Sequence, residues 1–380
     1  MGAASNIGIG VASALRPRLP AGTEVRIVDE VDELASAWDD LAGRTGASPF
    51  AHPGWLLAWS EAYSRPERLR IVSVWRENDL VAVLPVDIRG RSAFSPTNWH
   101  TPAFTAVAAD AGATQVAVGG LLAAYGRRVR LSFVPDGDPM MDTLFSPMGH
   151  HVSRRVLQRS PHVAVEGPWD AYLAGRSANL RSDVRRRLRR IEELGPVRLD
   201  VSDGTTALGS LLDEGLRLEG SGWKEDAGTA IASSESTRRF YSNIASWAAP
   251  RGWLSLAFLR VGERAVAFQY GIVANNTYHF LKGGYDPGLR SCSPGKVLHA
   301  LMIERTFDEG LSRYDFLGGE EPYKTAWSSG GTDLLEVNVA SGAMGRIVHG
   351  HGRALARDVV SHGSRLGSAL RRRVASERPQ

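Results

Sequence analysis

Apolar residues in the first half of the chain are spaced as two short helices followed by a β-hairpin. Residues 32–43 and 52–63 carry apolar positions at helical spacing, and Pro53 stands near the start of the second segment, where a helix tolerates proline. Residues 69–88 contain two β-rich runs on either side of the polar turn Glu77-Asn78-Asp79. Such runs around a polar turn predict a hairpin.

The second half repeats this order at a spacing of roughly 185 residues. Helices are predicted over 206–220 and 234–248, and a hairpin that turns at Gly262-Glu263 is predicted over 253–273. Aligned on the two turns, ENDLVAV lies over GERAVAF. The identity is too low to prove a duplication, but the order of the elements agrees.

A strand, a loop, a helix and a further strand follow the second hairpin. The pattern predicts a strand over 277–286, a helix over 296–310 and a strand over 312–319. A mostly antiparallel meander that feeds one such crossover is typical of an α+β fold with a central mixed sheet.

Arginine-rich segments lie between the halves and at the end of the chain. Residues 169–195 predict one or two helices closed by Gly195-Pro196. Arginines occupy nearly every position from 185 to 190, so they cannot share one helix face. From Gly345 onward, arginines alternate with small apolar residues, which predicts a marginal amphipathic helix with a frayed end.

Length, composition and charge are those of a globular protein with a local excess of arginine. A chain of 380 residues suggests two or three domains, and 43% hydrophobic residues with 23% charged residues can form a sizeable core. The formal net charge is only +4, but arginines gather in residues 181–190 and 353–373. Such runs suit phosphate-bearing partners such as nucleic acid, nucleotide cofactors or anionic lipid.

Other composition signals exclude several classes of protein. The single Cys292 excludes an internal disulfide and favours a reducing compartment. No apolar run is long enough for a transmembrane helix, and the apolar N-terminal segment lacks a preceding basic stretch, so the expected location is the cytoplasm. GIGVAS at Gly8 lacks the third glycine of a dinucleotide loop, and the histidines form no convincing metal-ligand set. No metal is therefore expected.

The loop SCSPGK opens the helix that follows the second hairpin. A helix start presents unpaired backbone N–H groups and the positive end of the helix dipole, and both favour an anion such as phosphate. Ser293 and Pro294 begin the turn, Gly295 allows close approach, and Lys296 or Arg290 adds positive charge. The alternative is a capped helix with nothing bound.

Asp315 and Lys324 are the sharpest candidates for chemistry. Asp315 lies in the last predicted strand, where a carboxylate accepts a proton from an amine or, alternatively, bonds to loop backbone as a structural group. Lys324 is one of only four lysines among 45 Lys and Arg residues, and it lies between Tyr323 and Trp327. A compact ammonium there can stabilise an acyl oxyanion or grip a phosphate. The alternative is a surface lysine lying over aromatic rings.

Two further segments supply candidate substrate contacts. The loop GSGWKEDAG carries Trp223 and Lys224, and it suits a substrate loop as well as an ordinary helix connection. Tyr285 and Asp286 fall at the end of the strand before the SCSPGK loop. Trp327 is a further candidate, because it would shape the pocket around the lysine.

The strand 277–286 also places one histidine among these candidates. Strand alternation puts His279 on one face and Lys282 on the other, before any bulge at the paired glycines that follow. For His279, the role of a hydrogen-bonded strand histidine is favoured over that of a catalytic base. The residue is also a candidate substrate contact.

These residues together resemble a known family. A hairpin, a strand, an anion-ready loop, a helix and a further strand is the order found in the acyl-CoA-binding core of GNAT acyltransferases. Residues 267–327 resemble the acetyltransferase domain of the CelD-type family, associated in bacteria with cellulose and other exopolysaccharide synthesis. SPFAHPGWLLAW at 48–59 and NLRSDVRRRLRRIEELG at 179–195 also resemble it, so the likeness covers most of residues 25–340. These proteins are similar to the Fem aminoacyl-tRNA transferases, which have two GNAT-like halves.

The resemblance implies an α+β protein of two fused GNAT-like domains, each a mixed, mainly antiparallel sheet flanked by helices. The implied division is a flexible leader over 1–24, a degenerate GNAT-like domain over 25–165, an acyltransferase domain over 166–340 and a basic amphipathic tail over 341–380. By resemblance, Lys324 with Tyr323 would contact the acyl carbonyl or the donor phosphate. Asp315, or a water that it holds, would remove the proton.

The implied activity is N- or O-acylation with acetyl-CoA or another acyl-CoA as co-substrate. The acceptor would be an amine or hydroxyl of a small molecule, sugar or peptide, in exopolysaccharide or cell-envelope biosynthesis. One alternative is an aminoacyl-tRNA donor, with the arginines of residues 181–190 facing RNA, although the coiled-coil arm of Fem proteins is not visible. Another is a non-catalytic scaffold of an exopolysaccharide assembly. No DNA partner is expected, and the basic tail would touch anionic membrane or a partner protein.

Overall fold

The structure is a computed structural model that describes residues 21–146, 150–221, 231 and 234–341. The predicted leader and basic tail lie almost entirely outside the described residues. Trp223 and Lys224 also lie outside them. In the part of the chain that is described, no helix is long and apolar enough to cross a membrane.

The N-terminal half contains the two helices and the hairpin that its apolar pattern predicts, which confirms that prediction. Its elements are β1 (Thr23–Val28), α1 (Ala35–Thr45), α2 (Pro53–Tyr63), β2 (Leu69–Arg76), β3 (Asp79–Arg89), β4 (Ser92–Phe94), β5 (Val107–Ala108), α3 (Ala111–Tyr125), β6 (Arg128–Pro135), α4 (Pro139–Leu144) and β7 (His150–Ala164). The sequence pattern does not predict helix α3 or the strands of this half from β4 to β7.

The C-terminal half follows the same order, after two helices that join the halves. Its elements are α5 (Trp169–Ala174), α6 (Ala178–Glu192), β8 (Val197–Ser202), α7 (Leu208–Gly220), α9 (Glu235–Ala248), β9 (Leu254–Val261), β10 (Arg264–Ala274), β11 (Thr277–Tyr285), α10 (Pro294–Asp308), β12 (Arg313–Asp315), α11 (Pro322–Thr325) and β13 (Gly330–Ser341). The last predicted strand was expected to end at Gly318-Gly319 but ends at Asp315. Leu317 and Gly318 take the left-handed φ values 52° and 65°, which end an extended strand.

The fold is α+β, with one 13-stranded mixed sheet flanked by helices, and this confirms the expected class. The strand order is β1-β2-β3-β4-β6-β13-β7-β12-β11-β10-β9-β8, with β5 beside β3. Most neighbours are antiparallel. The pairs β4–β6 and β11–β12 are parallel, and each is joined through a crossover helix, α3 or α10. The two halves therefore share one topology, as the repeat spacing suggests.

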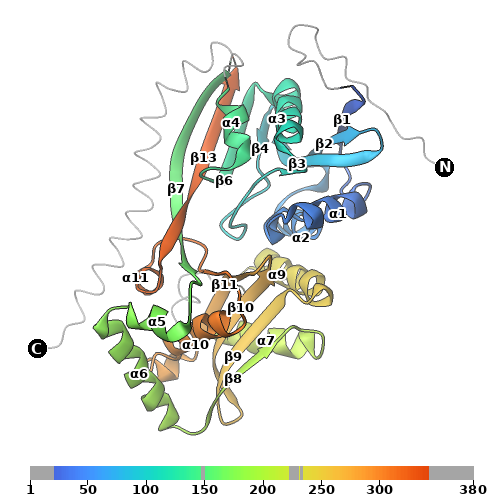
Figure 1. The fold of residues 1–380 in the computed structure, drawn as a ribbon. Coiled ribbons are helices and arrows are strands. Elements are labelled where there is room, and N and C mark those ends of the chain that lie inside the picture. The colour runs from blue at the N-terminus through green and yellow to red at the C-terminus, as the bar shows by residue number, and fades with distance from the viewer. Residues whose placement is uncertain (1–20, 147–149, 222–230, 232–233, 342–380) are drawn as a thin grey trace, which may run out of the picture.

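The strand that closes each half lies against the other half. β7 comes last in the first half but pairs with β12 of the second, and β13 comes last in the second half but pairs with β6 of the first. The two strands also pair with each other along their length, from Gly330 opposite His162 to Ser341 opposite His150. Figure 1 shows them side by side along one flank of the molecule. The halves are thus joined by exchanged strands rather than by a linker alone.

Helices α2 and α9 pack against each other where the halves meet (Figure 1). The contact is close, because a Cβ on Gly54 would lie 2.0 Å from Nε1 of Trp247. Trp55 and Phe240 meet there edge to face with ring centroids 5.4 Å apart, and both are buried. Burying one side chain of this kind stabilises a fold by about 1.5–3 kcal/mol. The junction therefore has the packing of a core.

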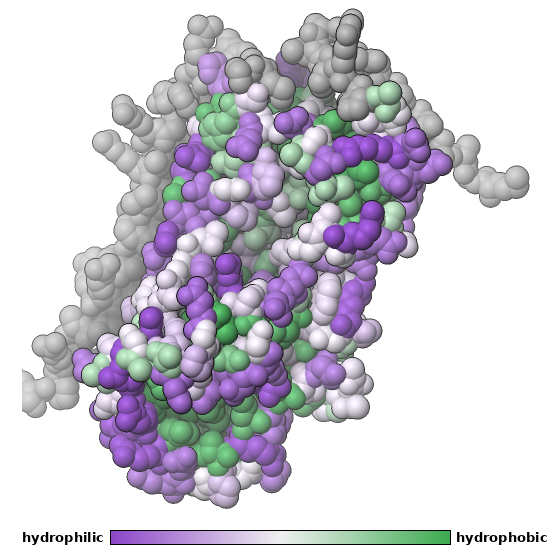
Figure 2. All heavy atoms as spheres, viewed as in Figure 1, coloured by the Kyte–Doolittle hydropathy of each residue, from purple (hydrophilic) through white to green (hydrophobic). Residues whose placement is uncertain are grey.

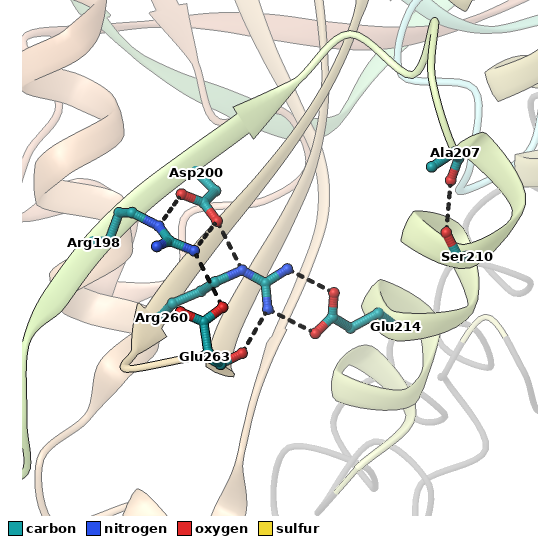
Figure 3. Close-up of polar contacts among 7 residues, drawn as sticks. All are labelled: Arg198, Asp200, Ala207, Ser210, Glu214, Arg260 and Glu263. Carbon is teal, nitrogen blue, oxygen red and sulfur yellow. Dashed lines mark hydrogen bonds and ion pairs between the residues drawn. The ribbon is translucent and has the colours of Figure 1, made fainter.

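An ion-pair network fixes α7 to the outer edge of the sheet in the second half (Figure 3). Arg260 on β9 binds both carboxylate oxygens of Glu214 on α7, at 2.9 and 2.7 Å, and its Nε bonds Asp200 on the edge strand β8 at 2.8 Å. Arg198 shares Asp200. Bidentate Arg–carboxylate pairs are the strongest of such contacts, so this network holds α7 in place over the sheet.

Candidate functional site

β11 and β12 run parallel for three residue pairs and then part. The last pair is His279 with Asp315, after which β11 continues to Tyr285. The chain beyond Asp315 bonds elsewhere: Phe316 N donates to Pro161 O of β7 at 3.1 Å. Ligands of α/β sheets gather where neighbouring strands part beside a crossover helix. Most of the predicted site residues lie along this parting.

The start of α10 lies at the far end of β11 and carries positive side chains. Ser293 has a left-handed φ of 49° and gives the helix no side-chain cap. Its Oγ accepts a hydrogen bond from the guanidinium of Arg187 on α6 and donates to Arg290 O at 3.1 Å. Lys296 Nζ lies 3.6 Å from a carboxylate oxygen of Asp183, which also pairs with Arg187. Three cations from α6 and α10 share this one carboxylate, and the positive charge left over suits a phosphate group at the helix start.

The arginines of α6 divide between two faces, as their spacing requires. Arg187 points to α10 with 17% of its side chain exposed. Four arginines are exposed on the outer side of the helix: Arg185, Arg186, Arg189 and Arg190. The aminoacyl-tRNA alternative expects all of these arginines to face RNA, and no expectation from the sequence places Arg187 at the start of α10. The apolar positions Val184, Leu188 and Ile191 mark the inward face and could have shown that Arg187 lies at its border.

Lys324 is buried at the point where the strands part. Only 5% of the residue is exposed. Its Nζ donates to Leu317 O at 2.7 Å and pairs with Glu321 at 2.8 Å. A Cβ on Gly318 would lie 3.0 Å from Nζ, so glycine there leaves room for the ammonium. Lys324 Nζ does lie over the ring of Tyr323, at 5.8 Å from its centroid, but the burial of the residue does not fit the alternative of a surface lysine.

Asp315 is half-buried, and one of its two carboxylate oxygens accepts both of its side-chain hydrogen bonds from the described residues. Its Oδ1 accepts hydrogen bonds from Ser160 Oγ at 3.1 Å and from Leu317 N at 2.9 Å, while Oδ2 has no hydrogen-bond partner among the described residues. Burial raises the pKa of this carboxyl, against the opposing effects of those two hydrogen bonds and of the positive charges on Arg313 and Lys324. An open oxygen on a carboxylate of raised pKa fits a proton acceptor.

His279 lies beside Asp315 and is neutral. It is 8% exposed, its ring centroid lies 5.0 Å from that of Phe50 of the N-terminal half, and burial lowers its pKa to about 3. Its Nδ1 has no partner among the described residues. This environment is that of a packed strand histidine rather than of an exposed substrate contact.

A β-bulge changes the direction of Lys282 relative to the alternation expected from the sequence. Tyr270 pairs with Lys282 and Gly271 with Phe280, so Leu281 is the extra residue. Lys282 Nζ therefore lies 5.9 Å above the ring of Tyr241 on α9, on the side opposite α10. The expectation that Lys282 would face away from His279 is wrong, because the bulge precedes the paired glycines.

The aromatic residues around Lys324 lie in different environments. Tyr323 is 37% exposed, its ring lies 5.2 Å from that of His299 on α10, and burial of its hydroxyl raises the pKa above the ordinary value. Trp327 is only 3% exposed, and its ring stacks on that of Trp169 on α5 at 6.1 Å. Tyr323 can thus reach a ligand, whereas Trp327 supports the segment from beneath.

Tyr285 and Asp286 mark the end of β11. A Cβ on Gly295 would lie 3.3 Å from the ring of Tyr285, so this ring borders the start of α10. Asp286 pairs with Arg264 and accepts from Gly288 N at 2.9 Å. Together with Arg217 it lines a cavity of about 280 Å³ on the α7 side of the sheet. Among the described residues, no group of three or more His, Cys, Asp or Glu could hold a metal ion.

Comparison with known proteins agrees with this geometry. Residues 178–325 match the family described as acetyltransferase (GNAT) domain. The matched range contains α10, the parting strands and Lys324, so the part of the chain that is similar to a GNAT acetyltransferase domain is the part that holds the candidate site. No curated protein sequence matches the chain.

Two solved structures are similar along nearly their whole length. One is the C-terminal domain of a protein from Agrobacterium fabrum named as a lysylphosphatidylglycerol synthetase, with a TM-score of 0.54, 14% identity, 86% of this chain covered and 97% of that one. The other is FemX, with a TM-score of 0.52, 12% identity, 86% of this chain covered and 99% of that one. At these identities the likeness shows the fold alone.

Proposed function

We propose that this protein is a GNAT-type acyltransferase that moves an acyl group, acetyl in the simplest case, from acyl-CoA to an amine or hydroxyl acceptor. One observation carries the proposal. A helix start with no side-chain cap and two cations, a buried ammonium, and a carboxylate with one open oxygen all lie along the same pair of parting strands. These are the three groups that a direct acyl transfer needs.

In the proposed complex, the phosphates of the donor lie at the start of α10. The backbone N–H groups of the first turn and the side chains of Arg187 and Lys296 would hold them. The acyl arm would then extend along β11 toward its parting from β12, where Lys324 places a positive charge. Tyr285 borders this path through its contact with Gly295.

The reaction would be a direct attack by the acceptor on the thioester carbonyl. The acceptor nitrogen or oxygen forms a bond to the carbonyl carbon, its proton passes to Asp315 Oδ2, and the C–S bond breaks to release the CoA thiolate. Lys324 would stabilise the negative charge that develops on the carbonyl oxygen. The thiolate would take its proton from water and Asp315 would later lose its own to water, because the raised pKa of Tyr323 makes that hydroxyl a poor proton donor; Tyr323 would border the thioester.

Calorimetry with acetyl-CoA tests the donor site. Wild type is expected to bind, and Arg187→Ala to bind at least tenfold more weakly, because the guanidinium beside Ser293 is lost. Arg186→Ala is the matched control, since its side chain faces solvent and its one ion-pair partner among the described residues is Asp183. Absence of acetyl-CoA binding by wild type, or equal affinities of the two variants, would contradict the proposal.

A second candidate, an aminoacyl-tRNA donor, is favoured by the outer face of α6. Six arginines and two acidic residues give this helix a formal charge of +4, equal to that of the whole chain. In Figure 2 strongly hydrophilic side chains gather over its position. This reading predicts binding to charged tRNA that weakens steeply with salt and is lost when Arg185, Arg189 and Arg190 become Ala.

Two finer parts of the proposal follow from the family resemblance: a CelD-type role and an acceptor in exopolysaccharide or cell-envelope biosynthesis. A cytoplasmic location follows from the sequence, whose single Cys292 favours a reducing compartment. Absence of binding to both donors would favour the non-catalytic scaffold instead.

A further inference from the structure

β7 belongs to the N-terminal half in chain order, yet it borders the candidate proton acceptor of the C-terminal half. His162 is the backbone partner of Asp315, and Ser160, two residues earlier, lies on the same face of the sheet. Ser160 is 4% exposed, and its hydroxyl donates to Asp315 Oδ1 at 3.1 Å. This hydrogen bond joins residues 155 positions apart in the chain.

The groups that face Asp315 come from four elements. They are Arg313 on the same strand, Lys324 on α11, His279 on β11, and Ser160 and His162 on β7. Burial lowers the pKa of both histidines, so neither is a counter-ion at neutral pH. The carboxylate is therefore held by two hydrogen bonds, from Ser160 and from the backbone of Leu317, while the positive charges of Arg313 and Lys324 favour its ionised form.

The N-terminal half reaches this place from a second element. Phe50, in the short turn before α2, packs edge to face on His279 with ring centroids 5.0 Å apart. His279 in turn is the backbone partner of Asp315 on the side opposite β7. Asp315 thus has side chains of the first half on one flank and a histidine packed by the first half on the other.

We propose that Ser160 is a positioning residue for Asp315, and that the exchanged strand β7 makes the acyl-transfer site a joint product of both halves. This inference rests on the proposed role of Asp315 as proton acceptor. The hydroxyl fixes Oδ1, which leaves Oδ2 directed to the acceptor, and its hydrogen bond favours the ionised form against the burial that raises the pKa of this carboxyl.

The test is an NMR titration of the Asp315 carboxyl in full-length protein labelled with ¹³C at aspartate, with Asp315→Asn to identify the signal. Ser160→Ala removes the donor to the ionised form, so the midpoint of titration is expected to rise by about one pH unit. Ser160→Thr keeps a hydroxyl and should titrate near wild type. Ser153→Ala, on the same strand but opposite Asn338, is the matched control.

Ser160→Cys provides a second variant in case the alanine protein does not fold, because a thiol of similar size is a weak donor. It should show an intermediate midpoint. Equal midpoints in wild type and in whichever of the two variants folds would overturn the inference. Acetyl-CoA calorimetry on the same samples separates the two proposals: no binding by wild type would refute the donor site, while the titration would still decide whether Ser160 holds Asp315.

Discussion

In the N-terminal half the crossover helix α3 begins at Asp110, whereas in the C-terminal half the corresponding helix α10 begins at Ser293. Asp110 caps its helix, because its Oδ1 accepts from Ala113 N at 2.8 Å, and its carboxylate pairs with Arg76 at 2.6 Å. Ser293 makes no such cap and has Arg187 beside it. The first half fills its helix start with its own anion, and the second surrounds its helix start with cations.

The parallel strands beside these helices also differ, because the chain beyond them is bonded together in the first half and parts in the second. In the first half the chain after β4 is bonded to β6, because Ser132 N donates to Ser95 Oγ at 2.8 Å and Phe104 N donates to Phe133 O at 2.9 Å. In the second half pairing between β11 and β12 ends at Asp315. The first half thus closes the corresponding parting and lends its last strand, whereas in the second half the strands part beside the proposed acyl-transfer site.

Removal of the N-terminal half should have the largest effect. A chain that begins at residue 166 lacks β6 and β7, so β13 loses both neighbours and β12 loses one. The helix α9 also loses α2. We expect this fragment not to fold cooperatively, as measured by circular dichroism during thermal unfolding. A soluble fragment with a sharp unfolding transition would show that residues 166–340 are an independent domain, as the sequence division assumes.

Lys324→Met should have the next largest effect, on the rate of acyl transfer. All four lysines lie in the second half, and this one is buried at the parting strands. Loss of one donor to a developing oxyanion lowers kcat by roughly 10²–10³-fold. The measurement is CoA release from acetyl-CoA with a small amine at saturating donor. Lys296→Met is the control, since an exposed lysine at the helix start should affect donor binding and not this rate. Equal loss in both variants would remove Lys324 from the chemistry.

Asp110→Ala should have the smallest effect, confined to stability. Loss of a helix cap costs about 1 kcal/mol in the free energy of unfolding. The hydrogen bond from Arg76, and then that from Ala113 N, lowers the pKa of Asp110 to about 2. A lowered pKa contributes stability above the ordinary value near 4. Wild type and variant should therefore converge as the pH falls from about 4 to about 2. Urea unfolding across this range is the measurement, with the exposed Asp79→Ala as control.

The sequence predicts the paired helices and the hairpin of both halves and the crossover of the second half, but not the crossover of the first half or how the last strands pair. Apolar spacing locates α2, α9 and both hairpins because each pattern is local, and the turns at Glu77 and Gly262 fix the repeat. The alternation of apolar and polar residues along a strand does not say which strand it pairs with. The sequence therefore predicts neither the exchange of β7 and β13 nor the contact of Ser160 with Asp315. Arg187 was hidden among similar neighbours, whereas Lys324 stood out because lysine is rare here.

The most direct test of the contrast between the halves exchanges their helix starts and counts bound donors by calorimetry with acetyl-CoA. Ser293→Asp would supply the second half with its own anion, in a left-handed position that aspartate tolerates. Asp110→Ser keeps a cap on α3 but removes the anion. We predict one donor per chain in wild type and in Asp110→Ser, with at least tenfold weaker binding in Ser293→Asp. Two donors per chain, or unchanged binding by Ser293→Asp, would contradict the account.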